Sequence, residues 1–369
     1  MRVLVCTNMW PSAARPTFGS FVQEQVDDLQ RAGLEIDVLY IRGTESRANY
    51  ARAAVHLRRR LASRPYDLVH AHYGLTGAVA LTQRKVPVVT TFHGSETGYV
   101  PWQTRVSWFV ARMSEPIFVS SDARVRMKLP RAHVIPVGVD VDLFRPLDRP
   151  AVRRELGWQP DARHVLLPGS RGNRRKGATL FDAVFEQVRD GAPDVQAVTL
   201  DNLSRAGAAR VVAASDVVLM TSEFEGAPAA IKEALACATP IVSVPVGDVP
   251  ETISGLPGCF VAGREVSSLA AAVLRALQKP GGQALRARAE EFARPLIAER
   301  VIRVYEQVLG GSQAEAISGQ SFGLDGNGRV TGVVDHIRQD SLEIQAGLPA
   351  DRALDPLDRR LTVERVLDA

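Results

Sequence analysis

The sequence predicts an α/β protein with two parallel-sheet domains, and three observations support this prediction. Short apolar segments alternate with amphipathic helical segments through residues 1–309, the rhythm of a parallel sheet with crossover helices. The length of 369 residues exceeds one typical domain and fits two plus an extension. An apolar content of 46% with 23% charged residues is typical of a soluble globular protein.

The first half of the chain is expected to form one Rossmann-like domain. A helix over residues 21–32 carries an apolar stripe of Phe21, Val22, Val26 and Leu29 and ends at a glycine. A long, proline-rich loop precedes it. The expected strands are residues 3–6, 36–41, 68–71, 86–91, 116–120 and 133–136.

The second half repeats the pattern. Its final helical segment, residues 284–309, is interrupted by Pro295 and could return to the first domain. The expected strands are residues 164–167, 195–200, 217–220, 241–244 and 259–262, and the expected helices are 180–188, 206–214, 229–238 and 266–278.

The loop between residues 220 and 229 is the most informative stretch. In an open α/β sheet such a strand-to-helix loop lies at the carboxyl edge, where ligands bind. Glu225 lies in the loop and Glu233 lies in the helix, while Pro228 is expected at the first helical position. Carboxylates that accept from sugar hydroxyls, beside free amide N–H groups that donate to phosphate oxygens, would suit a nucleotide sugar. The alternative is a capped helix with two solvated glutamates.

The residues of this stretch resemble a known signature. The matching positions are Ser222, Glu225, Gly226, Pro228, Glu233, Ala234, Ala236, Cys237, Pro240, Gly247, Pro250 and Glu251, and their order resembles that of retaining family 4 glycosyltransferases. This resemblance covers about residues 1–309. It implies a GT-B fold, with two Rossmann-like domains facing a central cleft. Residues 1–145 would be the acceptor-side domain, 146–309 the nucleotide-sugar-binding domain, and 310–369 an appendage expected to be partly disordered.

The resemblance also implies roles for individual residues. Glu225 would hold the sugar, His93 would lie beside it, and Glu96 would serve either the acceptor or the structure of its own loop. His70 is expected to point into the sheet packing instead. The implied donor-binding residues are Gly19, Gly226, Ala227, Pro228, Ala229 and Glu233.

A basic, glycine-rich loop spans residues 168–177. Its cations precede a helix and could neutralise a diphosphate leaving group. In the family an arginine and a lysine do this without a metal ion. Lys176 matches the lysine, whereas the arginine is ambiguous: Arg171 is the first choice and Arg174 and Arg175 are alternatives.

We expect no metal ion and no cofactor. The Asp140–Asp142 triplet resembles a cation-binding motif but falls in the interdomain connector, so we interpret it as turn and capping residues. His70 and His72 lack further ligands at suitable spacing. Residues 324–330 match only part of a calcium loop and suggest a turn between two weak strands.

Composition restricts the partners and the location. A net charge of +4 gives little support for nucleic-acid binding. The three cysteines, Cys6, Cys237 and Cys259, fall in expected core elements without metal spacing, which indicates a reducing, cytoplasmic setting. No signal peptide is recognised. Basic and aromatic residues in 47–64 and 99–113 suggest peripheral contact with anionic lipid on the inner face of a membrane.

The resemblance therefore implies a metal-independent, retaining, hexosyltransferase-like enzyme acting between a nucleotide-sugar donor and an unknown acceptor. The acceptor could be a cell-envelope lipid or polysaccharide, or a small molecule. Two alternatives remain: a GT-B nucleotide-sugar epimerase, and a non-catalytic nucleotide-sugar-binding module. The segment 195–222 is shorter than in many relatives, so the nucleobase pocket is the least readable part of the donor site.

Overall fold

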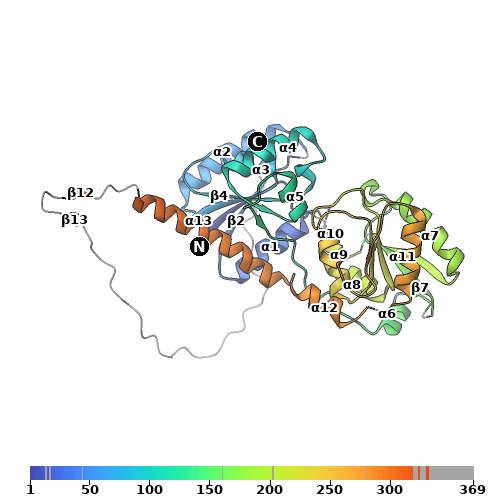
Figure 1. Ribbon diagram of the computed structural model, residues 1–369. Coiled ribbons are helices and arrows are strands. Elements are labelled where there is room, and N and C mark those ends of the chain that lie inside the picture. Colours follow the sequence, from blue (N-terminus) through green and yellow to red (C-terminus); the bar gives the residue numbers. More distant parts are fainter. Residues whose placement is uncertain are drawn as a thin grey trace, which may run out of the picture.

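The computed structural model contains two parallel sheets, each with helices on both faces (Figure 1). It describes residues 1–12, 15, 18–43, 45–159, 161–201, 203–279, 281–318, 323–324 and 330–331, with side chains up to residue 310. This arrangement confirms the expected α/β class. Most of the predicted appendage, including the calcium-like turn, lies outside the described residues. The short strands β12 (Gly323–Leu324) and β13 (Val330–Thr331) that flank this turn pair antiparallel.

The first sheet has the strand order β2-β1-β3-β4-β5-β6, and its strands pair in parallel. The central strands β1, β3 and β4 are almost wholly buried, which explains why their sequences are mainly apolar. The strands are β1 (Arg2–Thr7), β2 (Glu35–Tyr40), β3 (Leu68–His72), β4 (Val88–Phe92), β5 (Glu115–Phe118) and β6 (His133–Val134).

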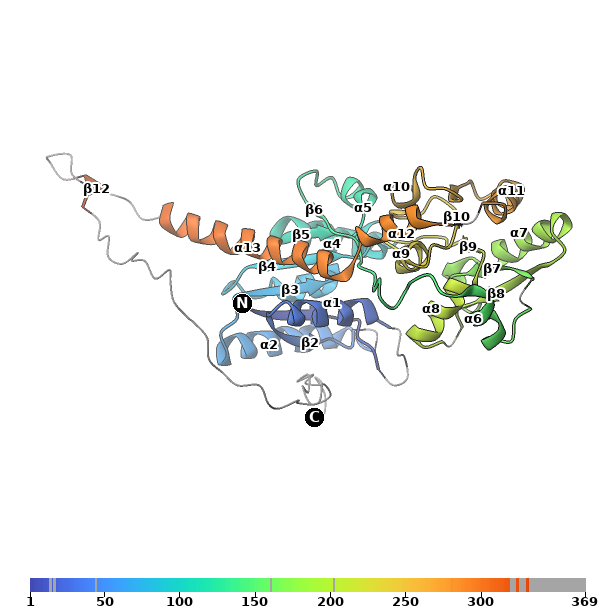
Figure 2. The ribbon, with the colours of Figure 1, turned by 90° about the horizontal axis from the view of Figure 1, so that it is seen from below.

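Helices cover both faces of this sheet (Figure 2). The apolar stripe of α1 packs on one face, and Leu57 and Val79 are buried against the other. The helices are α1 (Ser20–Arg31), α2 (Ala48–Ser63), α3 (Gly74–Ala80), α4 (Pro101–Met113) and α5 (Ser121–Arg126), with a 3₁₀ turn η1 (Ser95–Thr97).

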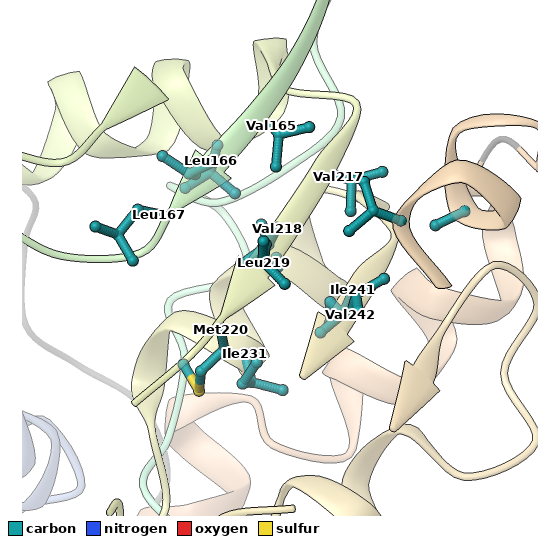
Figure 3. Packing of buried hydrophobic residues seen from close by; sticks show 14 of the residues in the cluster. Val165, Leu166, Leu167, Val217, Val218, Leu219, Met220, Ile231, Ile241 and Val242 are labelled. Carbon is teal, nitrogen blue, oxygen red and sulfur yellow. The ribbon is translucent and has the colours of Figure 1, made fainter. Parts of the chain in front are cut away.

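The second sheet has the order β11-β10-β9-β7-β8, again parallel. Side chains of β7, β9 and β10 pack with Ile231 of α9 in a dense apolar core (Figure 3). The strands are β7 (Arg163–Leu167), β8 (Val195–Thr199), β9 (Val217–Met220), β10 (Ile241–Ser243) and β11 (Phe260–Val261). The helical segments are α6 (Arg149–Glu155), η2 (Arg174–Lys176), α7 (Ala178–Gly191), α8 (Arg205–Ala214), α9 (Ala229–Ala236), α10 (Val249–Ile253), α11 (Val266–Leu277), α12 (Gln283–Glu290) and α13 (Arg294–Ser318).

The chain crosses between the two sheets twice, and the crossings pair with each other. The N–H of Val139 donates to Phe292, and the N–H of Arg294 donates back to Val139. After the second crossing α13 returns to the first sheet, as expected, where Val301 and Tyr305 are buried beside α1. The helix runs on to Ser318, so the expected domain end at residue 309 falls inside a helix.

Two local expectations were wrong. The long C-terminal helical segment is interrupted at residues 291–293, and Pro295 lies in the first turn of α13, where a missing N–H has no cost. Pro228 is the N-cap of α9 rather than its first helical residue, because its ψ of 119° is extended. The helix therefore starts at Ala229.

Candidate functional site

Lys176 and Glu225 meet at the carboxyl edge of the second sheet. β7 lies between β8 and β9, so the strand order reverses there, and open α/β sheets bind ligands between the loops at such a point. The first loop carries Lys176 and the second carries Glu225. Nζ of Lys176 donates to Oε1 of Glu225 over 2.7 Å, and Oγ of Ser222 donates to the same oxygen over 2.9 Å. Topology thus joins two predicted site residues that are far apart in sequence.

This ion pair is largely withdrawn from water. The side chains of Lys176 and Glu225 are 16% and 8% exposed. A buried pair gains attraction but loses hydration, so its net contribution to stability is small. Lys176 could instead balance a phosphate, and Glu225 could accept from a sugar hydroxyl. The pair therefore has the chemistry of a ligand site in which the charges of the two side chains balance each other.

The N-terminus of α9 is a second polar feature of this edge. Within the described chain Pro228 gives this helix no side-chain cap. The N–H of Ile231 donates to the Pro228 carbonyl, which leaves the N–H groups of Ala229 and Ala230 as those available to a ligand, and the helix dipole favours a negative or electron-rich one. Ala227 and Ala229 therefore stand where the sequence predicted donor-binding amides.

The two sheet edges touch through glycines. A Cβ on Gly94, in the loop after β4, would lie 2.6 Å from Cα of Gly226. A Cβ on Gly226 would lie 2.0 Å from the carbonyl oxygen of His93. A side chain at either position would force the backbones apart, so glycine permits this close approach. The loops that carry His93 and Glu225 consequently lie against each other where the two domains meet.

The three candidate arginines of the basic loop point to different places. Arg171 is exposed and pairs with Asp182 of α7, so the structure does not bring it to Lys176. Arg174 is exposed. Arg175 is half-buried over the ring of Phe224, which stacks on Tyr99 of the first domain at 4.2 Å. Of the three, Arg175 therefore lies where the two domains meet. Arg171, the first choice from sequence, does not.

Glu233 is buried and already engaged by a residue that the sequence did not indicate. Arg205, at the start of α8, donates to Oε1 of Glu233. Its Nε also lies 3.2 Å from Oε1 of Glu24 on α1. Burial raises the pKa of Glu24, although Arg205 and Arg294 act against this. One guanidinium thus links Glu233, a predicted donor-binding residue, to the first domain. An isolated arginine in sequence gives no signal of such a bridge.

The facing edge of the first sheet carries histidines rather than ions. Nδ1 of His72, at the end of β3, lies 3.1 Å from Nε2 of His93, and their rings stack. His70 is buried between Thr91 and Tyr305, with its ring nitrogens 2.8 and 2.6 Å from their hydroxyls. The prediction that His70 serves packing is confirmed.

Burial keeps these imidazoles neutral. It lowers the pKa of His72 to about 3 and the pKa of His70 and His93 well below the usual range. In the neutral pair one ring donates and the other accepts. Among the described residues Nε2 of His72 has no partner. His93 is half-buried, and it lines a pocket together with His72, Phe21 and Glu24.

Tyr73 is a half-buried residue that packs beside His93. It follows β3 with φ of +80° and ψ of 149°, a conformation rare for a residue with a side chain. Its ring lies 4.9 Å from that of His93. Burial raises the pKa of its hydroxyl, with Glu96 adding to the rise.

Glu96 shapes the loop that holds His93. It is buried, and its Oε1 accepts the backbone N–H of His93 over 2.8 Å. Burial raises its pKa to about 7, although the N–H bonds act in the opposite direction. Of the two predicted roles, these contacts support the structural one.

Gly19 precedes α1 in a left-handed conformation, with φ of +78°. A Cβ there would lie 2.5 Å from the carbonyl carbon of Met9. Glycine is therefore required for the approach of the β1–α1 loop to its own helix start. The contact explains the glycine without a ligand, and donor binding at Gly19 stays a prediction.

Candidate metal ligands are dispersed. No group of three or more His, Cys, Asp or Glu side chains suits a metal ion within the described ranges. Asp140 caps its own turn, since Oδ1 accepts the N–H groups of Asp142 and Leu143. Its interpretation as a capping residue is confirmed. The three cysteines are free thiols, with Cys259 less deeply buried than the other two.

The outer face of α4 exposes aromatic side chains. Trp108 is 47% and Phe109 57% exposed, with Trp102 and Met113 on the same face. Arg112 lies over the ring of Trp108 and Arg47 over that of Trp102. In the part of the chain that is described, helices fall short of the length and hydropathy needed to span a membrane.

Comparison with protein families gives two matches. The family model for Glycosyltransferase Family 4 matches residues 2–143, and that for Glycosyl transferases group 1 matches residues 186–279. Together they fall on the two sheets described above.

Individual relatives and structures agree with these matches. A "D-inositol 3-phosphate glycosyltransferase" of Mycobacterium marinum is 30% identical over 280 residues, covering 62% of this chain and 60% of that protein. The Mycobacterium tuberculosis protein of the same name is 28% identical, covering 68% of this chain and 63% of that one. The chain thus spans about three-fifths of the length of these relatives.

Solved structures share the fold. Sucrose-phosphate synthase from Thermosynechococcus elongatus has a TM-score of 0.71 at 18% identity, covering 84% of this chain and all of that one. HepE of Anabaena in complex with UDP has a TM-score of 0.62 at 17% identity, covering 83% of this chain and all of that one. These likenesses support the GT-B arrangement of the two sheets.

Proposed function

This chain belongs to the glycosyltransferases of family 4 and group 1, and on that premise we propose that it transfers a sugar from a nucleoside-diphosphate sugar to a hydroxyl acceptor, with retention and without a metal ion. The observation that carries the proposal is the pairing of Lys176 with Glu225 beside the uncapped start of α9. The cation matches the diphosphate and the charge of the leaving group, while the carboxylate and the free amides match the hydroxyls of the sugar.

The donor would replace the internal ion pairs. The diphosphate would take Lys176 from Glu225, with Arg175 beside it, and the freed Glu225 would accept from a sugar hydroxyl. Ribose hydroxyls would compete with Arg205 for Glu233. Each charged side chain would exchange one partner for another, so the donor need not leave any of them buried and unpaired.

Chemistry would occur at the junction of the two edges. The bond between the anomeric carbon and the phosphate oxygen breaks while the acceptor oxygen attacks from the same face, which retains configuration. The acceptor proton passes to the departing phosphate, whose charge Lys176 and Arg175 stabilise. No protein nucleophile is assigned. Neutral His93, held by Glu96 and His72, would hydrogen-bond the sugar without adding positive charge near the oxocarbenium-like centre.

The named relatives support the donor class. HepE is described in complex with UDP-glucose as well as UDP, so UDP-sugars come first in a donor panel. The mycobacterial relatives are named for an inositol phosphate acceptor. Their names make a polyol phosphate one acceptor to include, beside cell-envelope lipid extract.

The test is nucleotide release from a panel of nucleotide sugars, with and without each acceptor. Acceptor-dependent release supports the transferase. Sugar isomerisation without an acceptor would favour an epimerase, and tight binding without turnover would favour a binding module. Product anomeric configuration, read by NMR, tests retention.

We also propose peripheral contact of α4 with an anionic membrane. Exposed tryptophans beside arginines match the interface between acyl chains and anionic headgroups. The apolar residues of α2 differ from one another, since Leu57 is buried whereas Val55 is 47% exposed. Sedimentation with phosphatidylglycerol vesicles should exceed that with phosphatidylcholine and fall for Trp108→Ser/Phe109→Ser. Equal binding of the variant would contradict the proposal.

A further inference from the structure

Lys232 and Asp248 form an ion pair buried behind the β9–α9 turn. Lys232 of α9 is fully buried, and Asp248, the N-cap of α10, is 7% exposed at its side chain. Nζ of Lys232 donates to Oδ2 of Asp248 and lies 5.6 Å from the ring centre of Phe292. Burial lowers the pKa of Lys232 and raises that of Asp248, while each partner opposes the shift of the other.

Stability alone is a weak reason for such a pair. Apolar side chains of similar volume usually stabilise a core as well as a buried ion pair does. Oδ1 of Asp248 also has no hydrogen-bond partner among the described residues. What the pair does fix is the position of Asp248, because Lys232 anchors it to the rigid helix α9.

Asp248 in turn holds the loop that carries Glu225. Its backbone N–H donates to the carbonyl oxygen of Gly226 over 3.0 Å. Gly247, with φ of +53°, lies so close that a Cβ would be 2.1 Å from the same oxygen. The Gly226 carbonyl is therefore fixed toward the start of α10.

The direction of this carbonyl determines the direction of the next amide. The C=O of Gly226 and the N–H of Ala227 belong to one planar peptide and point in opposite directions. The N–H of Ala227 must consequently point away from α10. A tilt of this peptide would misalign the amide at the start of α9 without moving Lys176 or Glu233.

We propose that Lys232 and Asp248 are positioning residues that aim the Ala227 amide at the donor sugar. The ion pair fixes Asp248, Asp248 fixes the Gly226 carbonyl, and that peptide aims the amide. Neither side chain touches the substrate. The inference rests on the proposed transferase function, because it requires that the Ala227 amide binds the donor sugar.

The test variant is Lys232→Met/Asp248→Asn, which removes both charges together and nearly keeps both volumes, so no buried charge is left unpaired. We expect kcat to fall on the order of 10²-fold, the scale for small misplacement at a reacting centre. The free nucleoside diphosphate lacks the sugar that the Ala227 amide would contact. Its Kd should therefore change less than about twofold.

The matched control is Arg153→Met/Asp216→Asn. This pair lies in the same domain, with side chains 8% and 17% exposed, but Asp216 precedes β9 and so sits at the opposite edge of the sheet. It should lower Tm with little change in kcat. If both double variants gave the same kcat at temperatures where both are folded, the positioning role would be overturned.

Hydrogen exchange gives a readout independent of activity. Amides of residues 224–230 should exchange faster in the Lys232/Asp248 variant and at the wild-type rate in the control. Unchanged exchange in the variant would also overturn the inference. If instead wild-type protein released no nucleotide from any donor while exchange behaved as expected, the proposed function would fail and the coupling would stand.

Discussion

The two sheet edges that face each other in the cleft differ in how they manage charge. The second edge gathers ions, with Lys176 against Glu225 and Arg205 against Glu233. The first edge instead places neutral rings there, those of His72 and His93. Ions that are paired with each other can exchange partners with a charged ligand. Neutral rings can hydrogen-bond a sugar without an electrostatic cost. The difference suggests that phosphate is held on one side and the reacting centre is enclosed by the other.

The largest expected effect concerns the cation of the charged edge. Lys176→Ala should lower kcat on the order of 10²-fold or more, the scale for losing a preorganised charge-stabilising group. Steady-state kinetics with a working donor measures this. Arg174→Ala is the control, since that side chain is exposed. Small and equal effects of the two substitutions would contradict the role of this loop at the leaving group.

The next prediction concerns the neutral edge. The native pKa of His72 is about 3, below its unfolded value near 6.5, so the unfolded state binds more protons under acid conditions. The free energy of unfolding contributed by this residue is fully present above pH 6.5 and falls as pH decreases toward 3. At pH 5 the loss should be about 2 kcal/mol.

Chemical unfolding of wild type and His72→Gln between pH 5 and 8 measures this difference. The variant should lose less stability on acidification than wild type. His56→Gln, on α2 outside the cluster, is the control and should follow wild type. Parallel curves for wild type and His72→Gln would show that the neutral edge is not maintained by burial.

A smaller effect should separate the two glutamates. Contacts to the sugar can strengthen as the anomeric carbon gains positive charge, whereas ribose contacts stay the same throughout. Glu225→Gln should therefore mainly lower kcat, and Glu233→Gln should mainly raise the donor KM, each about tenfold. Calorimetry with the nucleoside diphosphate alone should detect Glu233→Gln only. Equal weakening by both variants would contradict the division of roles.

Chelation should have the smallest effect, namely none. If Lys176 and Arg175 supply the positive charge at the diphosphate, excess EDTA should leave the initial rate unchanged. Loss of activity that magnesium or manganese restores would mean that the charged edge is incomplete without a cation, and Asp140 and Asp142 would need to be reconsidered.

The sequence by itself determined the alternation of strands and helices, because buried parallel strands and amphipathic helices have distinct apolar patterns. It also predicted that Glu225 and Lys176 share a site, that His70 is a packing residue and that Asp140 caps a turn. These predictions depend on local sequence context and on two short segments, the signature of residues 222–251 and the basic loop of residues 168–177.

Tertiary structure decided the rest. The sequence could not decide between Arg171 and Arg175, because neighbouring side chains of a loop point in different directions. Asp182 of α7 pairs with Arg171 and so holds it away from Lys176. Arg205 carries no local pattern, since its partners Glu24 and Glu233 come from distant segments. Whether a polar side chain is solvated or paired depends on which elements the fold packs against it, and that is a property of the whole chain.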